Sequence, residues 1–170
     1  MKRGFTLIET VVVVAIIGIL AGISFTSMEK MNRGARLQSF CDEASSLIRK
    51  GYKIDSSAID FDAVRVAFEK DLNGISFKLY KKEGNGEKTV ATIENNNVVL
   101  KGIKINGTDY EALKDGFNFK FNNDGTILIS SGNTSEIKAD ILELVFSLKN
   151  SEAEKTIELK SLPPGSVVVK

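Results

Sequence analysis

Glu9 is the residue whose type and position in this sequence most clearly point to chemistry. It is the one ionisable residue in the apolar segment from Phe5 to Phe25. Placing an ionisable group in the middle of a membrane helix costs about 2.5–3.5 kcal/mol on insertion scales, so such a group is expected to have a partner or a role. The chemistry open to Glu9 is ion pairing with a cation in a low-dielectric setting, where pairing counts for most.

The composition excludes the commonest catalytic groups. The 170 residues contain no histidine and one cysteine, Cys41. This excludes Ser-His-Asp and Cys-His catalysis, histidine-ligated zinc and an intrachain disulfide. An enzyme would have to use carboxylates, lysines and hydroxyls alone, and the sequence shows no nucleophile motif. We therefore expect a non-enzymatic protein with no cofactor and no metal.

The charge balance argues against a nucleic-acid partner. The chain has 23 basic and 22 acidic side chains, a net charge of +1. Its last 20 residues hold three lysines and three glutamates, and no arginine follows Arg65. Binding to duplex DNA needs several basic side chains on one face, and arginine is the residue that contacts phosphate bidentately. We expect no appreciable binding of duplex DNA at physiological salt by the exposed domain, roughly Glu29–Lys170.

A long N-terminal helix must position Glu9. The 21 residues from Phe5 to Phe25 would span roughly 30 Å as a helix, the thickness of the hydrocarbon core of a bilayer. Beyond them, apolar residues such as Leu37 and Phe40 recur at steps of three and four, the pattern of an amphipathic helix. We predict one helix with a membrane half over residues 5–26, an amphipathic half over residues 27–51, and an end at Gly51.

The first 26 residues resemble the N-terminal signature of type IV pilins and type II secretion pseudopilins. The matching run is Lys2-Arg3-Gly4-Phe5-Thr6-Leu7-Ile8-Glu9, followed by an apolar stretch. The order of features is a short basic leader ending in glycine, then phenylalanine, a nearby carboxylate and an apolar helix. The resemblance implies a leader peptide of residues 1–4, cleavage between Gly4 and Phe5 by a prepilin peptidase, and N-methylation of Phe5.

The resemblance also implies a role for Glu9 and a set of partners. Glu9 would pair with the new amine at Phe5 of an adjacent subunit and fix the axial register of that subunit. Gly18 and Gly22, four residues apart, would let neighbouring helices approach closely. The implied partners are other pilin or pseudopilin subunits, the peptidase, a cytoplasmic motor with its inner-membrane assembly platform, and membrane lipid before assembly.

The resemblance implies a single-pass membrane protein that later enters a filament. Lys2 and Arg3 would stay on the cytoplasmic side, as positive-inside logic expects. The C-terminal domain would be extracytoplasmic, and the assembled filament would be extracellular or would span the envelope. Two alternatives remain open. A cleavable signal peptide is disfavoured by the poor cleavage sequence Ala21-Gly22-Ile23, whereas a membrane-anchored binding domain that never polymerises would use the same anchor.

Residues 52–170 show the alternating pattern of β-strands. Asp124-Gly125 and Asn106-Gly107 are turn signals, the first of them between two alternating runs. A long helix followed by an antiparallel sheet predicts an α+β fold of the pilin type. The predicted strands are Ala63–Phe68, Ile75–Tyr80, Val90–Ile93, Val98–Leu100, Ile103–Ile105, Phe117–Phe121, Thr126–Ser130, Ile141–Leu148, Thr156–Leu162 and Val167–Val169.

Residues Phe117–Lys170 also resemble the C-terminal half of H-type minor pseudopilins and T-type minor pilins, in the spacing of phenylalanine and glycine. That resemblance implies two β-sheets packed on the long helix and a minor pilin or minor pseudopilin as the subtype. Asn122 and Asp124 offer oxygen ligands for calcium, but the loop lacks the acidic density of such a site, which favours a simple turn. Cys41 lies on the apolar stripe, where a packing role is expected.

Overall fold

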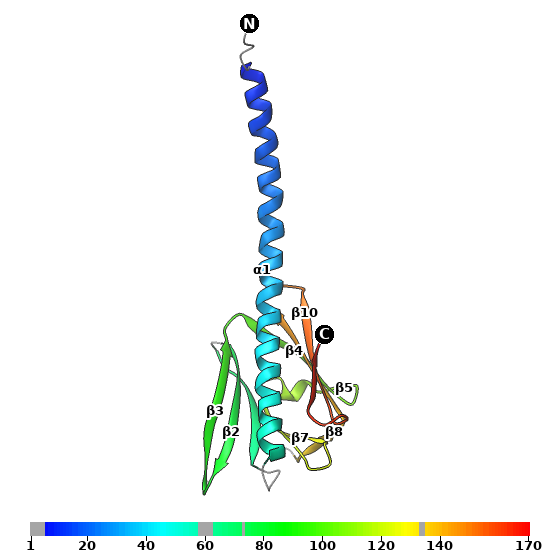
Figure 1. Ribbon diagram of the computed structural model, residues 1–170. Coiled ribbons are helices and arrows are strands. Elements are labelled where there is room, and N and C mark those ends of the chain that lie inside the picture. The colour runs from blue at the N-terminus through cyan, green and yellow to red at the C-terminus, as the bar shows by residue number, and fades with distance from the viewer. Residues whose placement is uncertain (1–5, 58–62, 73, 133–134) are drawn as a thin grey trace. The chain divides into compact units, whose positions relative to one another are not determined.

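The computed structural model describes residues 6–57, 63–72, 74–132 and 135–170. The chain divides into two units, Met1–Arg36 and Leu37–Lys170. One helix, α1 (Leu7–Ser57), begins in the first unit and ends in the second (Figure 1). The strands all belong to the second unit, and the fold is the predicted α+β arrangement of an N-terminal helix with antiparallel sheets.

The helix continues past the predicted end at Gly51 and stops six residues later at Ser57. Gly51 is buried, and a Cβ atom built on it would lie 2.9 Å from Cδ1 of Leu79. The glycine therefore lets the helix approach the sheet and does not terminate the helix. The added turn is held by packing, because the Tyr52 ring lies 5.1 Å from the Phe121 ring in an edge-on contact.

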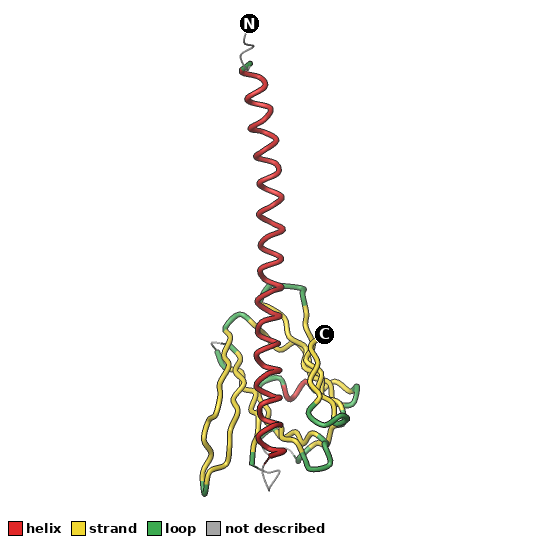
Figure 2. Tube along the Cα trace, in the orientation of Figure 1, coloured by secondary structure: helices red, strands yellow, loops and turns green. Residues whose placement is uncertain are grey.

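The strands form two antiparallel sheets, which Figure 2 shows in yellow. The six-stranded sheet has the order β3-β2-β1-β6-β7-β8, and the five-stranded sheet has the order β11-β10-β9-β4-β5. A short 3-10 helix, η1 (Glu111–Leu113), joins them after β5. The strands are β1 (Val64–Lys70), β2 (Ile75–Glu83), β3 (Gly86–Asn95), β4 (Val98–Ile105), β5 (Thr108–Asp109), β6 (Gly116–Phe121), β7 (Ile127–Ser130), β8 (Ile137–Ala139), β9 (Ile141–Leu148), β10 (Glu154–Lys160) and β11 (Ser166–Val169).

The predicted turns and strands agree with these elements, with three differences. The two short strands predicted over residues 98–105 are one strand, β4, with an irregularity between Leu100 and Gly102 where the register shifts against β9. Strands β5 and β8 were not expected, because two and three residues give too short an alternation to detect. The turn signals are confirmed: Gly125 has φ +85°, and Asn106 and Gly107 both have positive φ between β4 and β5.

The core of the second unit lies where the helix meets both sheets. Phe40 of α1 is 6.3 Å from Phe77 of β2 and 5.5 Å from Phe146 of β9, ring centroid to ring centroid. Phe77 and Phe146 are in turn 6.0 Å apart. Each ring comes from a different layer and all three are buried. In Figure 1 this part of the helix accordingly has β2 and β3 on one side and β10 on the other.

The C-terminal strand is fastened to the helix at two places. The Arg49 guanidinium donates a hydrogen bond to the carbonyl of Val167 in β11. The loop before β11 contains Gly165, whose φ is +72° and whose Cα lies so close to Tyr52 that a Cβ atom there would be 2.3 Å from the ring. Both the backbone conformation and the close approach require glycine at this position.

We predict that Gly165→Ala destabilises the protein far more than Gly107→Ala. Both glycines have a positive φ, which costs an L-residue about 1 kcal/mol, but a Cβ atom at Gly107 meets nothing within 4 Å. The overlap with Tyr52 adds about 2 kcal/mol at Gly165 alone. Urea unfolding of the two variants measures the difference, and equal losses would contradict the close packing of this loop on the helix.

Candidate functional site

Glu9 and Thr6 form a reciprocal pair at the start of α1. Oε2 of Glu9 accepts hydrogen bonds from the backbone N–H and the hydroxyl of Thr6, both at 2.8 Å. The backbone N–H of Glu9 donates to Oγ1 of Thr6 at 3.3 Å. This is a capping box, which satisfies backbone donors that the first turn of a helix leaves unpaired. The Thr-x-x-Glu spacing is the sequence signal of a capping box, but Glu9 was singled out only for its charge.

The first turns of α1 expose apolar side chains in every direction. The exposed fractions range from 47% at Val13 to 84% at Leu7. A helix that is apolar all round is stable only when lipid or protein covers it. Among the described residues, no helix has the length and hydropathy needed to cross a bilayer. The exposed large side chains of this stretch are Leu7, Ile8, Val11, Val12, Val13, Val14, Ile16, Ile17, Ile19 and Leu20.

Gly18 and Gly22 lie open on this apolar helix. A Cβ atom built at either position would meet no atom within 4 Å. Nothing in the described chain therefore requires glycine there. The structure places the two glycines in the apolar stretch that Glu9 begins, but it does not test their predicted role in helix packing. The predicted leader and processing residues Lys2, Arg3, Gly4 and Phe5 lie outside the described residues.

Residues 1–25 match a family model described as the prokaryotic N-terminal methylation motif. This chain carries the type IV pilin and pseudopilin signature. The motif identifies a pilin-like substrate of prepilin peptidase with a membrane-anchored N-terminus, and it indicates a structural subunit in place of an enzyme. No curated protein and no solved structure matches the chain.

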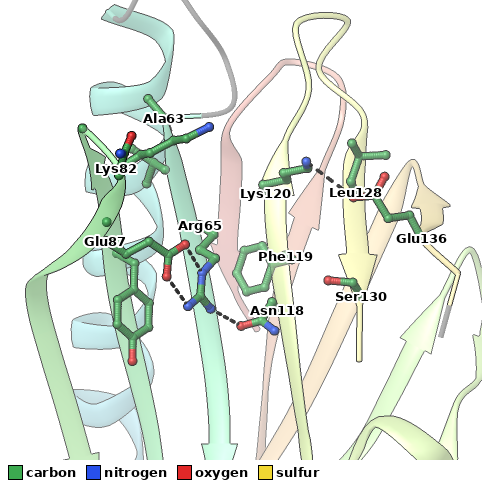
Figure 3. Close-up of a pocket in the computed structure, with 15 residues that line it drawn as sticks. Ala63, Arg65, Lys82, Glu87, Asn118, Phe119, Lys120, Leu128, Ser130 and Glu136 are labelled. Atoms are coloured by element: carbon green, nitrogen blue, oxygen red, sulfur yellow. Dashed lines mark hydrogen bonds and ion pairs between the residues drawn. The ribbon is translucent and has the colours of Figure 1, made fainter. Parts of the chain in front are cut away.

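The second unit of this pilin-like chain holds a cleft on the outer surface of the six-stranded sheet. Its volume is about 700 Å³, and its lining comes mainly from β1, β2, β3, β6 and β7 together with the turn between β2 and β3. Arg65 of β1 lies at its centre, between Glu87 and Asn118 (Figure 3). Across the cleft, Nζ of Lys120 on β6 lies 3.4 Å from Oε1 of Glu136.

The guanidinium of Arg65 on β1 contacts residues on three other strands, β2, β3 and β6. Nε and Nη2 donate to the two carboxylate oxygens of Glu87 at 2.7 and 2.5 Å, and Nη1 donates to Oδ1 of Asn118 at 2.6 Å. The guanidinium carbon also lies 4.2 Å from the centre of the Tyr80 ring. The hydrogen bonds from Arg65 hold the pKa of Glu87 below its usual range. This cluster was not predicted, because its members are far apart in the chain.

The loop Asn122–Asp124 uses its oxygens within its own turn. Oδ1 of Asp124 accepts from the N–H of Thr126 at 2.9 Å and from its hydroxyl at 2.5 Å, and these bonds lower the pKa of Asp124. Oδ1 of Asn122 accepts from the N–H of Asn123 at 3.0 Å. In the described part of the chain, no group of three or more His, Cys, Asp or Glu residues could hold a metal ion.

Cys41 is fully buried beside Phe40 and Ala44 on the helix stripe. Burial raises the pKa of its thiol to about 11, and the nearby negative charge of Asp42 adds to the rise. Because the thiolate is the reactive form, this environment makes Cys41 a packing residue, as predicted.

We predict that Cys41 is inert in the folded protein. A pKa of about 11 leaves the thiol protonated at neutral pH, and its reactive fraction grows only as the pH rises toward that value. A thiol reagent should label the native chain at least a hundredfold more slowly than the urea-unfolded chain at pH 8. Equal labelling rates in the two states would show that the stripe is not packed against the sheets.

We predict that Arg65→Lys destabilises the second unit by about 1 kcal/mol, because lysine cannot make the paired contact with Glu87. The pair is partly exposed, with 33% of the Arg65 side chain accessible, which limits the loss through solvent screening. Lys88→Ala is the matched control, since it breaks only the 3.8 Å pair with Glu83. Urea unfolding should show a measurable loss for Arg65→Lys alone.

Proposed function

We propose that this chain is a structural subunit of a type IV pilus or a type II secretion-like filament. The observation that carries the proposal is the start of α1, where an apolar surface exposed on all sides begins with a single capped carboxylate. Before assembly, lipid would cover this surface. In the filament, the helices of neighbouring subunits would cover it, so the apolar side chains would move from lipid to protein and never into water.

Glu9 supplies the polar contact that sets the position of each new subunit. Its side chain is exposed, and both of its hydrogen-bond donors from Thr6 reach the same oxygen, Oε2. The carboxylate can therefore keep the helix cap while Oε1 receives a cation. Cleavage after Gly4 would create that cation as the amine of Phe5 on a neighbouring subunit. In an apolar filament core this charge pair would have one favourable register.

Gly18 and Gly22 serve the same assembly step. Both are open to a partner, with no atom of the described chain within 4 Å of a Cβ position. Small residues four apart on an apolar helix allow two backbones to approach closely. The partners in this scheme are other pilin or pseudopilin subunits, prepilin peptidase and the inner-membrane assembly platform. The second unit would lie outside the cytoplasm.

The minor subtype rests on the resemblance of residues 117–170 to H-type and T-type minor subunits. The two sheets of the second unit agree with what that resemblance implies. A second candidate function is a membrane-anchored binding domain that does not polymerise, which the cleft around Arg65 favours. The two functions differ in whether Glu9 matters, because an anchor alone needs no carboxylate in its helix.

We predict that Glu9→Ala leaves membrane insertion intact and reduces incorporation into filaments by about tenfold or more, since a charge pair in an apolar setting contributes several kcal/mol. The matched variant is Glu9→Gln, which keeps a side-chain oxygen for the Thr6 cap but removes the charge. Immunoblots of sheared filaments and of membranes measure both quantities. Normal incorporation of Glu9→Gln would show that Glu9 serves only as a helix cap.

A further inference from the structure

The side of α1 that faces away from the sheets of the second unit carries charges of alternating sign. Glu43 and Lys50 are exposed on it and lie seven residues apart. The same step leads back in the sequence to Arg36. Seven residues make almost two turns of an α-helix, so side chains at this spacing share one side of the helix. We call Arg36, Glu43 and Lys50 the charge stripe, in which a negative charge stands between two positive ones.

The charges of Glu43 and Lys50 are not neutralised within the described chain. No ion pair between described residues includes either of them. The Glu43 carboxylate accepts a hydrogen bond from the neutral hydroxyl of Ser39 at 3.2 Å. Both charges are thus available to a partner, in contrast to Arg65 and Glu87, which are joined to each other.

A second helix has room to lie along the charge stripe. Ser39 and Ser46, which are also exposed and seven residues apart, place small side chains between the charges. Next to Ser46, a shallow groove of about 250 Å³ lies between α1 and β3, and Leu47, Ala91 and Ile93 form its apolar part. Because β3 is the edge strand of its sheet, no other strand of the described chain pairs with its outer edge. Small side chains at a contact let two helix axes approach closely.

The membrane fixes the direction of a neighbouring copy. Each chain has a membrane-anchored N-terminus of the pilin type, so copies in one membrane present their α1 helices in the same direction. Two such helices without a shift would place Glu43 beside Glu43 and Lys50 beside Lys50. A shift of seven residues, about 10 Å at 1.5 Å per residue, would place Glu43 of one copy beside Lys50 of the next. Because like charges repel and opposite charges attract, the charge stripe favours the shifted arrangement.

We propose that the charge stripe of one copy of this chain contacts the charge stripes of its neighbours, with each copy shifted by seven residues along the helix axis. Neighbours on the two sides are shifted in opposite directions, so Glu43 would meet Lys50 of one and Arg36 of the other. Such a contact is heterologous and repeats without closing. An exposed ion pair contributes little to affinity in water, so the stripe would set the shift between copies and leave the apolar helices to hold them together.

This inference rests on the proposed filament function and deepens it, because it names the residues that align the second half of α1 between copies. It differs from the role of Glu9, whose pair would form in the apolar half of the helix and would need cleavage after Gly4. The occupant is a second copy of this chain. A seven-residue repeat of alternating charge matches itself after a shift of one repeat, whereas an unrelated helix would match it only by chance.

The test reverses the charges of the stripe in the full-length chain. Glu43→Lys should lower the amount of the chain in sheared filaments about tenfold, because Glu43 meets neighbours on both sides, and Lys50→Glu about threefold, because it meets one. Reversal of all three charges (Arg36→Glu, Glu43→Lys and Lys50→Glu together) should restore the native amount to within about twofold, because the signs alternate again. Lys101→Glu, exposed on β4 of the other sheet, is the matched control and should have no effect. Immunoblots of membranes and of sheared filaments measure production and incorporation.

Disulfide formation in oxidised filaments measures the shift directly. In a Cys41→Ala background, a chain with both Glu43→Cys and Lys50→Cys should give a ladder of dimers, trimers and larger species. A disulfide needs Cα atoms within about 7 Å of each other, so the two cysteines of one chain, about 10 Å apart along the helix, cannot join. Glu43→Cys alone should give no dimer, and a dimer from it would show unshifted helices and overturn the inference.

Filaments that tolerate the single reversals, that are not restored by the full reversal, or that give no ladder would also overturn the inference and leave the proposed function standing. If the unsubstituted chain keeps residues 1–4 and enters no filament, the proposed function fails, and the inference fails with it.

Discussion

The structure depends on one constraint, which is that the first turns of α1 present apolar side chains on every side and cannot remain in water. Lipid and the core of a filament are the two environments that would relieve this constraint, and residues 1–25 of the same segment match the prokaryotic N-terminal methylation motif. Within residues 6–22, Glu9 is the only charged side chain, and it lies near the N-terminal end of the helix. Its capping contact with Thr6 supplies backbone hydrogen bonds at the helix start, so a charge can be kept there without leaving donors unpaired.

In the second unit, two sheets pack against one helix. Phe40, Phe77 and Phe146 form the junction, and each comes from a different layer. Arg49 and the close approach of Gly165 to Tyr52 fasten the last strand to the same helix. The side chains on the outer surface of the six-stranded sheet are not part of this core. It is on that surface that Arg65 contacts Glu87, Asn118 and Tyr80.

Local patterns in the sequence were sufficient to predict the helix, most of the strands and the main turns. Alternation over Phe117–Phe121 and the Asp124-Gly125 step are local signals, and the β6–β7 hairpin follows them. Features set by distant residues could not be predicted. Gly51 has the sequence context of a helix end, but it lies inside the helix. There the helix packs so closely on Leu79 of the sheet that a Cβ atom would overlap with it. The Arg65 cluster joins residues that are up to 53 positions apart, and no local pattern encodes that proximity.

We propose that the apolar helix begins a processed filament subunit. Mass spectrometry of the N-terminal peptide, from cells with an active prepilin peptidase, tests it most directly. The predicted result is a mature chain that starts at Phe5 and carries one added methyl group on its amine, with residues 1–4 absent. A chain that retains Met1 or the intact Gly4–Phe5 bond in those cells would contradict the account, and the helix would then be a membrane anchor alone.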